Sequence, residues 1–94
     1  MSDESEKTPQ QVKQLQQRIQ ELLDAYVQQE KFDFRLIVAK EYKQQEGFLQ
    51  ILVLPDREGV SGAEYSEVLT VVEHRLSRLD HVEHVMLMPV LVAA

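Results

Sequence analysis

The segment Phe48-Leu-Gln-Ile-Leu-Val-Leu54 is apolar at six of its seven positions and is rich in residue types that favour strands. Side chains along a strand alternate between the two faces of a sheet, so this segment is apolar on both faces except at Gln50. Strands of this kind lie at the centre of a sheet or beneath an interface. Pro55-Asp-Arg-Glu-Gly59 then ends the strand with residue types that are common in turns. We therefore expect residues 48–54 to form the central strand.

A second strand is predicted directly upstream, from Phe32 to Lys40. Polar Asp33 and Arg35 alternate there with apolar residues, which is the pattern of a strand with one buried face. The polar connection Lys43-Gln-Gln-Glu-Gly47 predicts a hairpin loop of about four or five residues. The residues expected to point inward are Phe32, Phe34, Leu36 and Val38.

Before these strands, the segment from Pro9 to Gln28 has the periodicity of an amphipathic helix. Thr8 can cap its start, Pro9 suits the first turn, and Gln11 lies three residues after the cap. The glutamines between the apolar positions are expected to form the solvated face. These glutamines are Gln10, Gln11, Gln14, Gln16, Gln17 and Gln20, and the apolar stripe consists of Val12, Leu15, Ile19, Leu22, Leu23, Tyr26 and Val27.

After the central strand, Ser61 and Glu64 form a capping-box pattern that begins a second helix, which should end near Leu79 or Asp80. A third strand is predicted from 82 to 92, interrupted near Pro89. Because proline cannot donate a ladder hydrogen bond, this strand is expected at a sheet edge. The stripe that the second helix should bury is Tyr65, Val68, Leu69, Val72, Leu76 and Leu79.

The element order is therefore α-β-β-α-β, which predicts an α+β fold: a two-layer sandwich with a three-stranded mixed sheet and two helices on one face. The first two strands should be antiparallel, and a right-handed crossover should leave the third strand parallel to the second. Ninety-four residues suffice for one domain. We expect residues 1–8 to be a disordered N-terminal tail and residues 9–94 to form that domain.

Two helices cover only one face of a sheet, so the apolar residues on the other face predict a partner, most simply a second copy of the chain. A substitution such as Ile51→Lys is expected to weaken this association without unfolding the monomer. The contact surface is expected to include Leu49, Ile51, Val53, Met86 and Met88.

The charge balance restricts the possible partners. Ten basic residues stand against sixteen acidic ones, for a formal net charge of −6. No segment offers a basic patch, which argues against binding to nucleic acid and to anionic membranes. The longest apolar stretch, Val85 to Ala94, contains Pro89 and is too short to span a bilayer. The N-terminus lacks the apolar core of a signal peptide, and the chain has no cysteine, so we expect a soluble cytoplasmic protein.

Three histidines lie close together in the sequence: His74, His81 and His84. His81 and His84, with Asp80 or Glu83, have the donor types of a zinc, nickel or copper site. In an extended segment the odd offset would point the two imidazoles to opposite faces, so the alternative is a set of polar residues around a turn. No nucleophile or oxyanion donor lies near them in sequence, so we predict neither catalysis nor a cofactor.

The order of elements and three segments carry a resemblance to a known family. The segments are Phe48-Leu-Gln-Ile-Leu-Val-Leu-Pro-Asp56, Glu73-His-Arg-Leu76 and Asp80-His-Val-Glu-His-Val85. From Val12 to about Val92 the chain resembles the cytoplasmic C-terminal domain of cation diffusion facilitator transporters, without their membrane part. The resemblance implies a homodimer that binds metal through histidine and acidic residues near the dimer junction. Met88 stands where that family often has a ligating histidine.

Gly59-Val-Ser61 and the helix after it also resemble the N-terminal domain of a bacterial ribosome maturation factor, which implies a role in ribosome assembly. Three functions follow as expectations. The first is a non-enzymatic homodimeric module that binds or regulates another protein. The second is a metal-responsive module that uses His81, His84 and a nearby carboxylate. The third is a ribosome-assembly factor.

Overall fold

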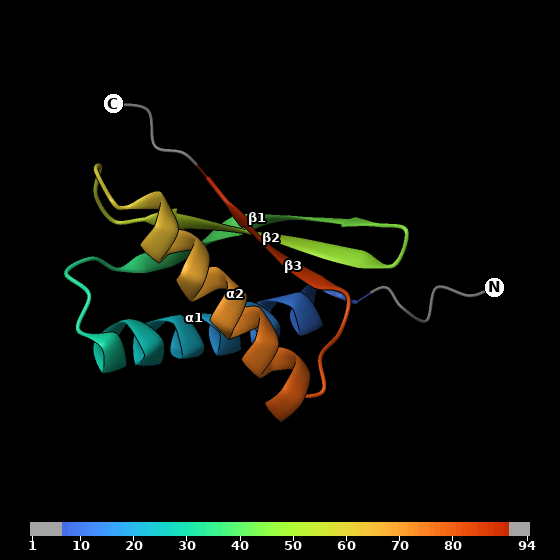
Figure 1. Ribbon diagram of the computed structural model, residues 1–94. Helices are drawn as coiled ribbons and strands as arrows, with labels where there is room; N and C mark the ends of the chain where they lie inside the picture. Colours follow the sequence, from blue (N-terminus) through green and yellow to red (C-terminus); the bar gives the residue numbers. More distant parts are fainter. Residues whose placement is uncertain (1–6, 91–94) are drawn as a thin grey trace.

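A computed structural model describes residues 7–90, and its elements follow the expected α-β-β-α-β order (Figure 1). Both helices lie on one side of a three-stranded sheet with the strand order β1-β2-β3. β1 is antiparallel to β2, and β2 is parallel to β3, so the predicted mixed sheet and its central strand are confirmed. The elements are α1 (Pro9–Glu30), β1 (Leu36–Gln45), β2 (Phe48–Pro55), α2 (Gly62–Leu79) and β3 (Val85–Pro89).

The predictions for the two ends of the chain fall mostly outside the described residues. Six of the eight residues expected to form the N-terminal tail, 1–6, lie there, as do residues 91–94 at the end of the domain. Lys7 and Thr8 are described. The backbone N–H of Lys7 donates to the side-chain oxygen of Gln44, and the Gln44 amide nitrogen donates back to the Lys7 carbonyl, at 2.9 and 2.8 Å. These two bonds join the chain before α1 to β1.

Helix α1 begins at the predicted cap and ends two residues later than expected. The Thr8 hydroxyl accepts from the Gln11 backbone N–H at 3.1 Å, and the Gln11 side chain accepts from the Thr8 backbone N–H at 2.9 Å. At the other end Lys31 adopts a left-handed conformation, with φ 59° and ψ 37°. The N–H of Lys31 then bonds the Gln28 carbonyl, and the N–H of Phe32 bonds the Val27 carbonyl. These two bonds satisfy the last carbonyl groups of the helix in a Schellman motif.

Strand β1 begins at Leu36, so the predicted start at Phe32 is wrong. Phe32 belongs to the helix-ending motif, and its ring stacks on that of Phe34, with the ring centroids 5.1 Å apart. Phe34 is buried and thus fills the core from a connecting segment. The alternation of apolar residues therefore predicted the burial of Phe34 correctly, but its prediction that residues 32–35 belong to a strand is wrong.

The connection between β1 and β2 is shorter than predicted. Gln45 pairs with Phe48, which leaves a two-residue turn, and its residues Glu46 and Gly47 have φ angles of 53° and 83°. Two consecutive positive φ angles are typical of a type I′ turn, whose twist matches that of the flanking strands. Polar residues 43–45, expected in a loop, therefore belong to β1. The tip of this hairpin reaches past the ends of both helices (Figure 1).

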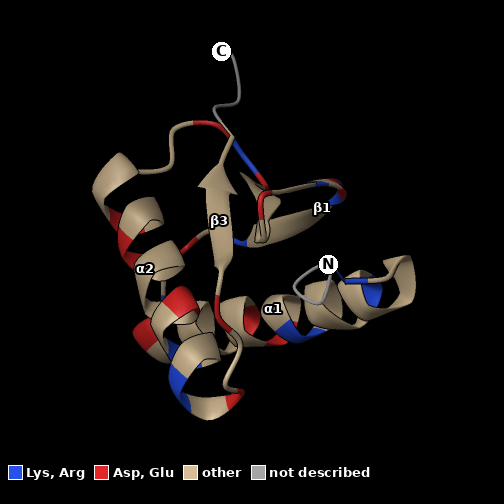
Figure 2. Ribbon diagram, turned by 90° about the vertical axis from the view of Figure 1, so that its right-hand side faces the viewer, with Lys and Arg blue, Asp and Glu red and all other residues tan. Residues whose placement is uncertain are grey.

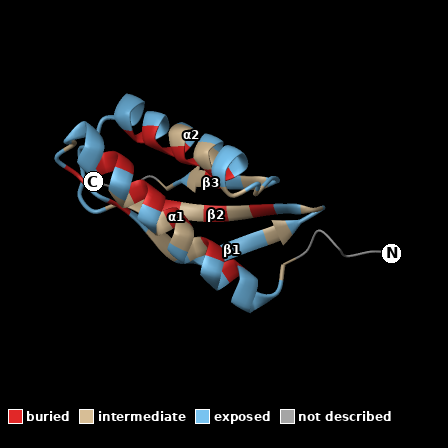
Figure 3. Ribbon diagram, turned by 90° about the horizontal axis from the view of Figure 1, so that it is seen from below, coloured by how far each residue is buried: buried red, intermediate tan, exposed pale blue. Residues whose placement is uncertain are grey.

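The register of the sheet defines which side chains share a face. Ile51 pairs with Tyr42 on one side and with Leu87 on the other. Leu87 is 4% exposed and Ile51 is fully buried, so both face the helices. Figure 3 shows buried residues at intervals along α1 and α2 and in β2. The helical side chains of this core are Val12, Leu15, Ile19, Leu22, Leu23, Tyr26, Val27, Tyr65, Val68, Leu69, Val72 and Leu76.

Strand β3 is shorter than the predicted range 82–92 and lies at the sheet edge, as expected. Val90 follows it, and its backbone N–H bonds the Val53 carbonyl at 3.2 Å. The hydroxyl of Tyr65 also accepts from the Val90 N–H, at 3.0 Å, and donates to the Val53 carbonyl. A single α2 side chain thus ties together the ends of β2 and β3. Within the described residues, neither helix has the length and apolar character that crossing a membrane requires.

Candidate functional site: the uncovered sheet face and the sheet edges

Three of the five residues predicted to form a contact surface lie in the core, so this part of the prediction is wrong. Leu49 is 3% exposed, and Ile51 and Val53 are fully buried against the helices. Met86 and Met88 lie on the opposite face, because they pair with Gln50 and Leu52. The substitution Ile51→Lys would therefore place a charge in the core and test folding instead of association.

The opposite face of the sheet has no helix over it in the described structure (Figure 1). Three of its side chains are exposed: Ile37 at 38%, Phe48 at 45% and Met86 at 41%. Leu52, Leu54 and Met88 are half-buried by their neighbours within the sheet. We call the surface formed by Ile37, Phe48, Leu52, Leu54, Met86 and Met88 the open face.

Charge is almost absent from the open face. Among the strand positions whose pairing places them on it, Lys43 at the hairpin end is the only charged residue; Glu41 lies in the irregular part of β1, where no pairing assigns it to a face. Gln50, half-buried beside Met86, is the polar residue nearest its centre. Figure 2 shows β3 without charged residues, whereas α1 and α2 carry both signs. The acidic net charge of the chain is therefore carried elsewhere.

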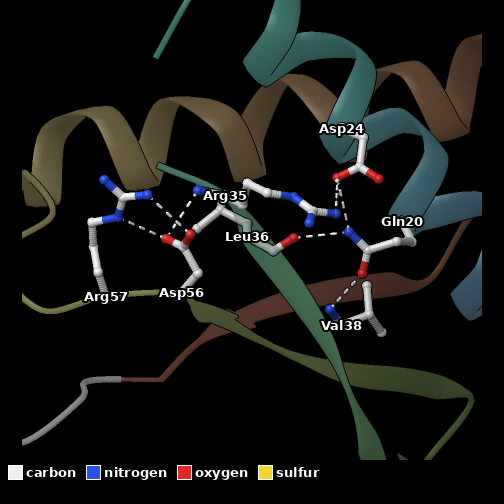
Figure 4. A network of polar contacts seen from close by, with 7 residues as sticks. All are labelled: Gln20, Asp24, Arg35, Leu36, Val38, Asp56 and Arg57. Carbon is white, nitrogen blue, oxygen red and sulfur yellow. Dashed lines mark hydrogen bonds and ion pairs between the residues drawn. The ribbon is translucent and has the colours of Figure 1, made fainter. Parts of the chain in front are cut away.

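The outer edge of β1 is bonded to side chains of α1 (Figure 4). The Gln20 amide nitrogen donates to the Leu36 carbonyl at 2.9 Å, and the Gln20 carbonyl accepts from the Val38 N–H at 2.9 Å. Gln16 donates to the carbonyls of Ala39 and Lys40 at 3.0 and 3.3 Å. Gln16 and Gln20 were expected on the solvated face of the helix, and this prediction is wrong. They are half-buried and satisfy backbone groups that a sheet edge otherwise leaves unpaired.

A second group of polar contacts holds the start of β1 (Figure 4). The Arg35 backbone N–H donates to the Asp56 carboxylate at 3.1 Å, and the Arg57 guanidinium donates to the same carboxylate at 3.1 Å. The hydrogen bond from Arg57, with that from Arg35, holds the pKa of Asp56 below its usual value. Asp24 on α1 pairs with the Arg35 guanidinium at 3.5 Å.

The outer edge of β3 is blocked in a different way. The Glu73 carboxylate, from α2, accepts the outward N–H of Leu87 at 2.7 Å. Pro89 has no N–H to offer. Both outer edges of the sheet are thus partly closed to pairing with another strand, which leaves the open face as the larger apolar surface.

The structure does not assemble the predicted metal site. The Asp80 carboxylate is bound by the Arg18 guanidinium at 2.8 and 3.3 Å, and this hydrogen bond holds the pKa of Asp80 below its usual value. His81 and His84 are exposed, and the His84 ring lies edge-on to Phe48 with centroids 5.2 Å apart. In residues 7–90 no group of three or more His, Cys, Asp or Glu side chains is arranged to hold a metal ion.

The residues of the open face could not be identified from the sequence pattern, because β2 is apolar at both alternating sets of positions. Ile51 and Leu87 are paired and both buried, which identifies the residues of β2 and β3 that face the helices. This pairing joins distant parts of the sequence and exists only in the folded sheet. No protein-family model, curated protein sequence or solved structure matches this chain.

Proposed function

We propose that the protein is a non-enzymatic interaction module that forms a homodimer through its open face. The observation that carries this proposal is the apolar sheet surface centred on Leu52, Met86 and Met88, opposite the two helices. Apolar patches on one side of a small domain mark sites where another molecule binds. A partner that covers apolar surface would also stabilise the fold, because a domain of this size buries only a limited share of its surface by itself.

The charge distribution supports a second copy as the occupant. Each chain has a net charge of −6, so two copies repel one another at long range. Contact through the six uncharged residues of the open face keeps most of the negative charges of the two chains away from the interface. A two-fold axis would also place each Met86 against the same type of surface, as self-complementary interfaces require. Methionine and phenylalanine are enriched in such interfaces.

The direct test is the molar mass in solution, measured by size-exclusion chromatography with light scattering at high micromolar concentration. The wild-type chain is expected to elute as a dimer. Met86→Lys adds a charge to the open face at a side chain that is already 41% exposed, so the variant is expected to fold and to be monomeric.

Leu79→Lys provides the matched control. Leu79 is the most exposed large apolar residue of the described chain, at 62%, but it lies at the end of α2 and away from the open face. This variant should remain dimeric with the same change in charge. A wild-type chain that is strictly monomeric would contradict the proposal, and so would a Met86→Lys variant that is folded and fully dimeric.

A further inference from the structure

A cleft of about 470 Å³ lies between α1 and the outer edge of β1. Four residues of α1 form one wall: Lys13, Gln16, Gln17 and Gln20. The consecutive β1 residues 38–40 form the other wall. The cleft is therefore bounded on one side by strand backbone and on the other by long polar side chains.

The hydrogen bonds of Gln20 show what this edge can bind. Its amide group donates to the carbonyl of Leu36 and accepts from the N–H of Val38, two residues further along. A residue of a parallel strand makes the same two bonds to its neighbour. A side-chain amide and a peptide group have the same donor and acceptor, so a peptide backbone can replace the Gln20 amide one bond for one.

The charges around the cleft favour a negatively charged ligand. Lys13 and Lys40 are its only charged lining residues, and within the described chain neither forms an ion pair. The nearest acids on α1 are already paired: Glu21 with Arg18 at 3.3 Å, and Asp24 with Arg35 at 3.5 Å. In a chain of net charge −6, the lining of this cleft is thus basic, although the exposed Glu41 follows Lys40 on β1.

We propose that the cleft binds an acidic peptide segment of a partner protein in extended conformation, as an added strand beside β1. The peptide backbone takes over the bonds that Gln16 and Gln20 now make, and its carboxylates lie near Lys13 and Lys40. Strand addition of this kind takes affinity from main-chain bonds and specificity from side chains. The site is separate from the open face and does not require a dimer.

The test uses the full chain and a fluorescein-labelled peptide of four Glu-Val repeats, with binding followed by fluorescence polarisation. The same peptide methylated at every backbone nitrogen carries the same charge but has no backbone N–H group to donate. We expect the methylated peptide to bind at least about tenfold more weakly, because it cannot complete the ladder. Equal binding of the two peptides would show attraction to any polyanion and would overturn the proposal, as would the absence of saturable binding.

Two sets of variants locate the site. Lys13→Glu with Lys40→Glu is expected to weaken binding of the Glu-Val peptide by at least about tenfold, since both charges are reversed. Lys31→Glu with Arg78→Glu makes the same change in net charge at exposed residues outside the cleft and should leave affinity within about twofold. Gln20→Ala removes the competing amide and should raise affinity. Similar loss in both double variants, or no gain in Gln20→Ala, would contradict binding at this edge.

Discussion

At the scale of single residues, Lys31 ends α1 in a backbone conformation that a residue with a β-carbon disfavours. Lys31 has φ 59°, the left-handed conformation in which glycine is the residue with the least strain. The conformation is held by the two hydrogen bonds that end α1, from Lys31 to Gln28 and from Phe32 to Val27. Glu46, His81 and His84 also have positive φ angles in the described chain.

Lys31→Gly is therefore expected to stabilise the domain by up to about 1 kcal/mol, because the side chain at Lys31 contributes strain in a left-handed residue. Lys31→Ala removes the same charge and keeps a β-carbon, so it should give no comparable gain. Urea unfolding of the three proteins measures the difference. Equal stability of the glycine and alanine variants would show that the conformation of Lys31 carries no strain.

Tyr26 provides a residue-scale prediction that depends on pH. Its hydroxyl donates to the Glu67 carboxylate at 2.6 Å, and this bond, with burial, raises the pKa of Tyr26 to about 12. The folded state thus holds the phenol proton more tightly than the unfolded chain, whose tyrosines ionise near pH 10. The stabilisation is complete below about pH 10 and is lost as the pH rises towards 12.

An absorbance titration of phenolate, compared between wild type and Tyr26→Phe, should isolate one group that ionises near pH 12. In Glu67→Gln, that group should ionise at lower pH, because the acceptor carboxylate is gone. If Tyr26 ionises near pH 10 in the wild type, the contact with Glu67 does not form in solution.

At the scale of elements, the sequence predicts the helices better than the strands. The caps at Thr8 and Ser61 and the apolar stripes of both helices are visible in sequence because their signals lie within one or two turns. The exception is Leu79, which was expected in the buried stripe of α2 and is 62% exposed. The ends of β1 depend on two features with no strong local signal: the helix-ending motif that takes Phe32 and the two-residue turn at Glu46. The role of Gln20 depends on the strand that packs beside it.

Gln20→Ala is expected to destabilise the domain by roughly 1–3 kcal/mol, since it leaves the Leu36 carbonyl and the Val38 N–H without their partner. Amide hydrogen exchange at Val38 should become faster as well. Gln17→Ala is the control, because Gln17 is exposed on the same helix and no hydrogen bond of its side chain is seen in the described structure. Equal effects of the two substitutions on stability would contradict the role assigned to Gln20.

At the scale of the whole molecule, the two-layer architecture agrees with the prediction from the sequence, whereas the predicted contact residues do not all lie on one face of the sheet. Within residues 7–90, the α-β-β-α-β order, the mixed sheet and an apolar face without a helix are confirmed. The predicted contact surface took the helix-facing residues of β2, because Leu49 and Leu52 are equally apolar, and joined them to Met86 and Met88 of the opposite face. Only the long-range pairing of β2 with β3 separates Ile51, which faces the helices, from Met86, which does not.

Whole-molecule association also predicts that stability depends on concentration. If the open face pairs two chains, the folded dimer is favoured by mass action, and the wild-type Tm should rise between low and high micromolar protein. Met86→Lys should have a Tm that does not change with concentration. A Tm that is constant for the wild type over this range would argue against a dimer linked to folding.

The most direct test of the open face as an interface is an isotope-filtered NMR experiment on an equal mixture of two samples. One sample carries ¹³C-labelled methionine methyl groups, and the other is unlabelled. We predict nuclear Overhauser effects from the methyl groups of Met86 and Met88 to protons of Phe48, Leu52 or Leu54 in the unlabelled chain. A dimer that shows no such contacts, or that shows contacts only to residues of α1 or α2, would contradict the proposal.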